Sequence, residues 1–211
     1  MRLGHSPAGC CLVVILALVV PAARAAIPVF EKMPTLNTQP LVADNTTVYA
    51  ITMTIRDADG YNDIREARTL FNYTLSGGDS SYGRGYLVWG KTDGDIQRYG
   101  GVWQLQDANG GGRWGYRTDA WGSDTYVTPM ACTMTAWGAS SGSTGYRAVT
   151  FTFKVKPTWA GNPLINRADA FTGDYTLDTG WLRGAEFDVL AQTPTSKVAR
   201  PSAPIVTNVR D

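Results

Sequence analysis

Three aspartates lie within seven residues of this chain, in the stretch Asp57-x-Asp59-Gly60-x-x-Asp63. Calcium prefers several carboxylate oxygens that converge from one turn, and a glycine permits the bend that brings them together. The stretch lacks the acids at loop positions five and twelve of an EF-hand, so an EF-hand is not predicted. Asp57, Asp59 and Asp63 would either bind calcium weakly or stabilise a turn by accepting hydrogen bonds from backbone N–H groups. The turn is the expected role, because short acidic motifs recur in many unrelated loops.

Aromatic side chains provide a second candidate site. The chain has seven tryptophans, and the densest aromatic stretch, residues 103–126, is also rich in Gly, Asp and Asn. Sugar rings stack their C–H faces on flat aromatic rings, while neighbouring polar groups bind the hydroxyls. Trp114, Trp121 and Tyr116 are the sugar-binding candidates, because Gly-rich surroundings favour exposure. Packing is the expected role of most other tryptophans, since β-sandwiches bury them in their cores.

Histidine is absent after the first residues, and this excludes most hydrolytic chemistry. The single histidine is His5. Serine and cysteine nucleophiles need an imidazole as proton acceptor, and most catalytic zinc sites need a histidine ligand. Glycoside hydrolases need only two carboxylates, but no pair stands out among 18 acidic residues. The sequence predicts a non-catalytic protein without catalytic residues, with a carboxylate-dependent glycoside hydrolase as the enzymatic alternative.

Residues 1–25 have the features of a cleaved export signal. Arg2 gives a charged start, residues 10–20 form an apolar run, and Ala23-Arg24-Ala25 is the small-x-small pattern that signal peptidases recognise. The run is too short to span a bilayer as a helix. We expect cleavage near Ala25 or Ala26, no membrane span, and a protein that is secreted or on the cell surface, or periplasmic if the source is Gram-negative.

The net charge limits the classes of binding partner, and the cysteine content limits the possible disulfides. The chain has 19 basic and 18 acidic residues, and loss of Arg2 and Arg24 with the signal changes its formal net charge from +1 to −1. A nearly neutral chain lacks the basic surface that nucleic acid or an anionic membrane requires. Cys132 is the one cysteine after the signal, so no internal disulfide is expected, and its apolar surroundings predict a buried core residue.

Alternating apolar and polar residues predict strands along most of the chain. Period-two patterning places one face of a strand in a core and the other in water. Asp-Gly and Asn-Gly steps between these stretches are typical of tight hairpin turns. Residues 64–71 would also fit two helical turns, but their β-rich neighbours favour a strand. The clearest apolar sets are Tyr49, Ile51, Met53, Ile55; Val149, Phe151, Phe153, Val155; and Met130, Cys132, Met134, Ala136.

These patterns predict an all-β fold, a single antiparallel β-sandwich. We expect four segments: the signal at 1–25, a Pro-rich lead-in at 26–40 with room for one edge strand, the sandwich at 41–192, and an extended C-terminal tail or linker at 193–211.

A family resemblance rests on several motifs of the mature chain. Residues 34–190 resemble an immunoglobulin-like or fibronectin-III-like module of large secreted bacterial proteins. The resemblance implies a β-sandwich with an adhesive or accessory role and no catalytic residues. We therefore expect a module for cell-surface, matrix or polysaccharide interaction, with an extracellular polysaccharide or a cell-surface protein as partner and a carbohydrate-binding module as the alternative. The matching motifs are Ile55-Arg-Asp-Ala-Asp-Gly-Tyr-Asn-Asp-Ile64, Gly85-Tyr-Leu-Val-Trp89, Trp103-Gln-Leu-Gln-Asp107, Met130-Ala-Cys-Thr-Met134, Phe151-Thr-Phe-Lys-Val155 with Trp159-Ala-Gly161, and Gly180-Trp181.

Overall fold

The protein is built from β-strands. The computed structural model describes residues 25–72, 83–92, 102–106, 112–116, 126–159, 166–174 and 177–192. Within these ranges there is no α-helix, only a single 3₁₀ turn, Pro157–Trp159. The strands are β1 (Val29–Leu36), β2 (Leu41–Ala43), β3 (Val48–Asp57), β4 (Glu66–Asn72), β5 (Gly83–Gly90), β6 (Val102–Gln106), β7 (Arg113–Tyr116), β8 (Val127–Gly138), β9 (Gly145–Val155), β10 (Asn166–Gly173), β11 (Glu186–Phe187) and β12 (Val189–Ala191).

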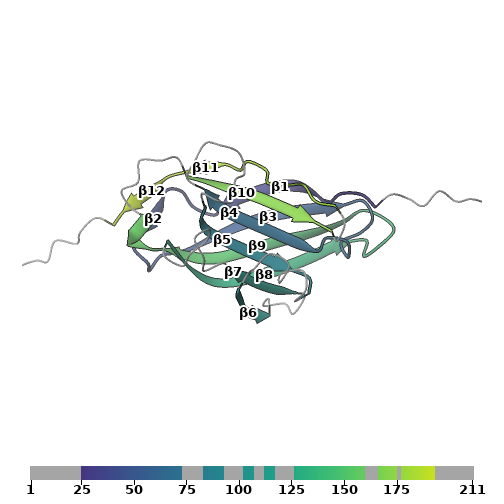
Figure 1. The fold of residues 1–211 in the computed structure, drawn as a ribbon, viewed down its shortest axis with the longest axis horizontal. Coiled ribbons are helices and arrows are strands. Elements are labelled where there is room, and N and C mark those ends of the chain that lie inside the picture. Colours follow the sequence, from purple (N-terminus) through teal and green to yellow (C-terminus); the bar gives the residue numbers. More distant parts are fainter. Residues whose placement is uncertain are drawn as a thin grey trace, which may run out of the picture.

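Two antiparallel sheets make up most of the fold, and their strands run roughly along the longest axis of the molecule (Figure 1). One has four strands in the order β1-β3-β9-β8, and the other has six in the order β11-β10-β4-β5-β7-β6. A short parallel pair, β12 with β2, lies beside them. The predicted all-β, mostly antiparallel fold is confirmed.

The four-stranded sheet follows the predicted alternation. Along β9, residues alternate strictly between buried and half-buried, and the apolar sets predicted in β3 and β9 are all buried. In the set predicted for β8, Cys132 and Met134 are buried, but Met130 is 42% exposed and Ala136 is also exposed, so the prediction was wrong for these two residues. The pairing of β8 with β9 shifts between Pro129 and Ala131. Such a bulge reverses the side on which the earlier residues point, and the prediction of a buried Met130 was wrong for this reason.

One hydrophobic core joins the two sheets. Phe71 of β4 packs on Phe153 of β9, with ring centroids 4.9 Å apart. Trp159 closes one end of this core against Phe71 and Phe187, and its indole Nε1–H donates to Asn166 Oδ1 at 2.8 Å. Cys132 is buried with a free thiol, as predicted. Burial of large apolar side chains from both sheets is the main contribution to folding.

The six-stranded sheet differs from the prediction because β10 is buried on both faces. Its outer face carries two buried ion pairs. Arg167 binds Asp169 through two hydrogen bonds, Nε to Oδ1 at 2.6 Å and Nη2 to Oδ2 at 2.8 Å. Along β4, Arg68 donates from both Nε and Nη2 to a single oxygen of Glu66, Oε2, and its guanidinium stacks over the Phe171 ring. Trp181 also packs on this face, against Phe171 and Tyr86.

The strand foreseen in the lead-in is β1, an edge strand that pairs with β3. The predicted strand at residues 64–71 is also confirmed, as β4. Among the described residues, none forms a helix of the length and apolarity needed to cross a bilayer. The predicted signal, except Ala25, and the predicted tail, from residue 193 on, lie outside the described residues.

Candidate functional site

The acidic loop, residues 57–63, begins at the last residue of β3 and packs on the hairpin loop between β8 and β9. Gly60 has a φ of 118°, and a Cβ there would lie 2.5 Å from the Ser140 carbonyl oxygen. Only glycine combines this backbone conformation with so close an approach. Tyr61 N–H donates to Ala139 O at 3.0 Å, and Gly142 N–H donates to Asp59 O at 2.6 Å. The glycine therefore sets the position of the whole loop against the hairpin.

The loop brings the three predicted aspartates together. Asp57, Asp59 and Asp63 each contribute a carboxylate oxygen, and these atoms lie within 4.8 Å of one another. Asp57 is only 1% exposed, and its Oδ2 has no hydrogen-bond partner. Burial raises the pKa of the Asp57 carboxyl above its usual range, and the neighbouring charges of Asp59, Asp63 and Asp174 add to this effect. The arrangement would favour a bound cation, because a cation relieves both the repulsion and the unmet hydrogen bonding.

The predicted turn is present in the same loop. Asp59 N–H donates to Asp57 Oδ1 at 2.7 Å, the Asx hydrogen bond expected for this sequence. Two basic side chains donate hydrogen bonds to backbone carbonyl groups of the loop. Arg147 Nε donates to Tyr61 O at 2.7 Å, and Lys91 Nζ donates to Asn62 O at 2.9 Å. The turn hydrogen bond uses only one oxygen of Asp57. Turn formation and cation binding are therefore compatible.

The predicted sugar-binding residues are not gathered at an exposed site. Trp114 lies in the core at 3% exposure, so the expectation that its ring is exposed was wrong. It pairs with Trp89 across β5 and β7, and the period-two alternation of β7 directs its ring inward despite the neighbouring glycines. Tyr116 is half-buried and packs against the same core. Trp121 lies outside the described residues.

A different aromatic pair is exposed. Trp137 near the end of β8 is 46% exposed, and its ring stacks on Tyr146 of β9 with centroids 5.3 Å apart and planes inclined by 5°. The two residues are directly paired across the strands. The Gly- and Ser-rich residues that follow Trp137 are typical of a turn, and they hide its cross-strand partner in the sequence. The signal available was the alternation Thr133, Thr135, Trp137, which places all three on one face of a strand.

The open face, defined as the outer face of the four-stranded sheet, carries this pair together with a row of threonines. Thr35, Thr52, Thr150 and Thr133 are paired in sequence across β1, β3, β9 and β8. Thr52 and Thr150 are hydrogen-bonded through their hydroxyls at 2.8 Å. Small hydroxylated side chains keep the sheet surface even, and the stacked rings lie on the same face, four residues away along β8 and β9.

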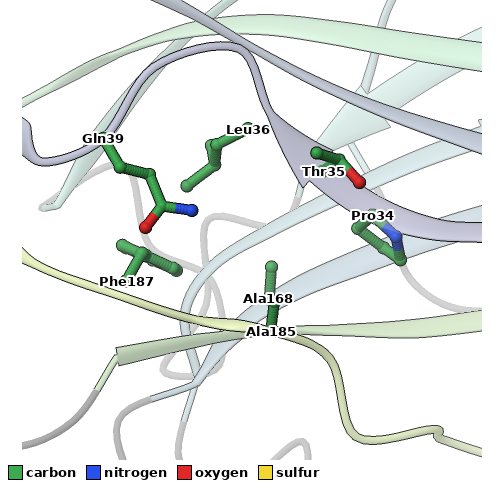
Figure 2. Close-up of a pocket in the computed structure, with 7 residues that line it drawn as sticks. All are labelled: Pro34, Thr35, Leu36, Gln39, Ala168, Ala185 and Phe187. Carbon is green, nitrogen blue, oxygen red and sulfur yellow. The ribbon is translucent and has the colours of Figure 1, made fainter.

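A small cavity lies between the end of β1 on one side and β10 and β11 on the other. Figure 2 shows Leu36 and Gln39 on one side and Ala168, Ala185 and Phe187 on the other. Its volume is about 40 Å³. Ligand pockets usually have ~300 Å³ or more, so this cavity is too small for a sugar ring.

Comparison with known proteins gives no family model, curated protein or solved structure that matches this chain.

Proposed function

We propose that this protein is an exported, non-catalytic immunoglobulin-like module that contacts an extracellular polysaccharide through the open face. The observation that carries the proposal is the stacked pair of the exposed Trp137 and the half-buried Tyr146, on the same face as the threonine row. The pair offers a flat aromatic surface to the C–H face of a sugar, and the threonine hydroxyls offer hydrogen bonds to its hydroxyl groups. The export step rests on the signal features of residues 1–25.

The strand order supports the immunoglobulin-like class. Immunoglobulin sandwiches place strands A, B, E and D in one sheet, and strands G, F and C with added strands in the other. Taking β1, β3, β8 and β9 as A, B, D and E reproduces the first sheet, A-B-E-D. Taking β4, β5, β10 and β11 as C, C′, F and G gives G-F-C-C′ in the second, with β7 and β6 as its extension.

The enzymatic alternative finds less support. A glycosidase needs two carboxylates across a cleft, one of them able to give up a proton. Glu66 and Asp169 are each buried and bound to an arginine, which leaves no room for substrate. Glu186 is exposed and pairs with Arg183 on the surface.

Polysaccharide binding is tested by retention. The protein is incubated with a panel of insoluble polysaccharides, covering β-glucans, chitin, peptidoglycan and mannans, and the bound fraction is measured after sedimentation. We expect retention by at least one of them, with an affinity at least about tenfold lower for Trp137→Ala, since a central aromatic anchor contributes ~1–2 kcal/mol or more. Leu190→Ala is the matched control, because Leu190 is 49% exposed away from the open face. Absence of retention on every polymer, or equal retention of the two variants, contradicts the proposal.

We also propose a calcium ion at the acidic loop. Its support is the unpartnered Asp57 Oδ2, which is buried and lies among the carboxylates of Asp59 and Asp63. These three side chains would supply hard oxygen ligands, which calcium prefers. A bound ion would neutralise charges that repel one another and would fasten the loop to the hairpin that carries Trp137.

Calcium is therefore expected to stabilise the fold. For a Kd of ~0.1–1 mM, typical of extracellular sites, 10 mM calcium adds ~1.5–3 kcal/mol to the free energy of unfolding. This corresponds to a rise of about 3–8 °C in Tm, measured by differential scanning fluorimetry against a chelator. Asp57→Asn should abolish the rise, whereas Asp44→Asn, in a separate exposed turn, should retain it. If the Tm of the unaltered protein is the same in calcium and in chelator, the calcium proposal is contradicted and the loop forms a turn only.

A further inference from the structure

The first residues that the structure describes, Ala25 and Ala26, lie at the acidic loop. The backbone nitrogen of Ala26 donates a hydrogen bond to Asp59 Oδ2 at 2.6 Å. Ala25, one residue earlier, is exposed, and Ala26 is half-buried. Residue 26 is also the first residue after the Ala23-Arg24-Ala25 pattern. The bond expected to be cut during export is therefore attached to the nitrogen that contacts Asp59.

Cleavage changes the charge of that nitrogen. Hydrolysis of the Ala25–Ala26 peptide bond by a signal peptidase transfers the hydroxyl of water to the Ala25 carbonyl carbon and its proton to the Ala26 nitrogen. The neutral amide N–H becomes an α-amino group, which is mostly protonated at neutral pH. A positive charge then appears within hydrogen-bond distance of Asp59 and beside the carboxylates of Asp57 and Asp63.

We propose that signal cleavage creates an ion pair between the Ala26 ammonium and Asp59, and that this ammonium becomes a resident cation of the acidic loop. The inference rests on the export step of the proposed function. The amide N–H already donates to a carboxylate, and the ammonium adds Coulombic attraction between opposite charges at the same short distance. A positive charge would also stabilise Asp57, because its Oδ2 is buried without a hydrogen-bond partner. Processing would thereby fasten the first residue of the mature chain to the β3–β4 connection.

The Ala26 ammonium and a bound calcium ion would lie near the same three carboxylates. A positive charge on Ala26 repels a second cation at the same carboxylates, so it should weaken calcium binding severalfold without preventing it. Asp59 contacts Ala26 through Oδ2, so this hydrogen bond does not use its Oδ1. The two effects are separable, because the ion pair is measured in chelator and calcium binding is measured by titration.

The test compares two forms of residues 26–211, which contain every described residue except Ala25. One form begins with a free Ala26 amine, and the other carries an Nα-acetyl group, which restores the neutral amide of the precursor. In chelator we expect the free-amine form to melt about 2–4 °C higher. In the Asp59→Asn background the difference should fall below about 1 °C. Asp44→Asn, a change in a distant turn, should leave the difference intact.

Equal melting temperatures for the two forms would overturn the ion pair, as would a difference that survives Asp59→Asn. The cleavage site is measured separately, by mass spectrometry of protein exported from a bacterial host with its own residues 1–25. Ala26 as the first residue supports the inference, and any other first residue overturns it even where the two prepared forms differ. Neither result depends on polysaccharide retention, so failure of polysaccharide binding is distinguishable from failure of the ion pair.

Discussion

Asp169→Ala is expected to lower the free energy of unfolding by about 3–5 kcal/mol. Asp169 is fully buried, binds both Nε and Nη2 of Arg167, and accepts the Gly184 N–H at 3.0 Å. Its removal leaves a buried guanidinium without its bidentate carboxylate, and the half-buried Gly184 N–H without its acceptor. Urea unfolding followed by tryptophan fluorescence measures the change.

The control for this prediction is an exposed ion pair of the same chemistry. Glu31 lies 3.5 Å from Arg56, and both side chains are about half exposed. Glu31→Ala should therefore cost less than ~1 kcal/mol, because water and salt screen the pair. Similar losses for Asp169→Ala and Glu31→Ala would contradict the buried ion pair on the outer face of the six-stranded sheet.

Trp159→Ala is expected to destabilise the fold to a similar extent, by about 3–5 kcal/mol. Trp159 is 1% exposed and contacts the rings of Phe71, Phe187 and Tyr126. The substitution opens a cavity between the two sheets and leaves Asn166 Oδ1 without the indole N–H that it accepts. Thermal or urea denaturation would report the loss.

Trp159→Phe separates the two contributions, since it keeps an aromatic ring but removes the hydrogen bond. Trp137→Ala is the matched surface control, and it should cost less than ~1 kcal/mol because its ring is half exposed and stacks on one partner. Equal destabilisation by Trp159→Ala and Trp137→Ala would argue against the shared core. A small cost for Trp137→Ala also allows its effect on binding to be read without loss of folding.

The sequence was most informative where a strand has one buried face. Apolar and polar residues alternate strictly from Val149 to Val155, and the structure places Val149, Phe151, Phe153 and Val155 in the core. The same rule explains Trp114, whose buried ring follows from the register of β7 with β5, although its glycine neighbours had suggested exposure. Composition around a residue is a weaker guide than the face of the strand on which it lies.

The burial of the outer face of the six-stranded sheet and the contact of Ala26 with Asp59 were not predicted, because each depends on segments far apart in the sequence. Glu66-x-Arg68 and Arg167-x-Asp169 each place opposite charges on one face of a strand, a signal visible in the sequence. Burial of that face was not predictable, because it depends on chain segments that pack over the sheet from elsewhere. The aspartates of the acidic loop were identified from their spacing, but the contact from Ala26 to Asp59 joins residues 33 positions apart. Local pattern cannot supply a contact of that range.

Backbone chemical-shift mapping locates the polysaccharide on the protein surface residue by residue. A ¹⁵N-labelled sample is titrated with a soluble oligosaccharide from the polymer that retains the protein most strongly. We expect the largest shift changes at Trp137, Tyr146 and the threonine row of β3, β8 and β9, and we expect Trp137→Ala to remove them. Shift changes confined to other surfaces, or none at saturating oligosaccharide, would contradict binding at the open face.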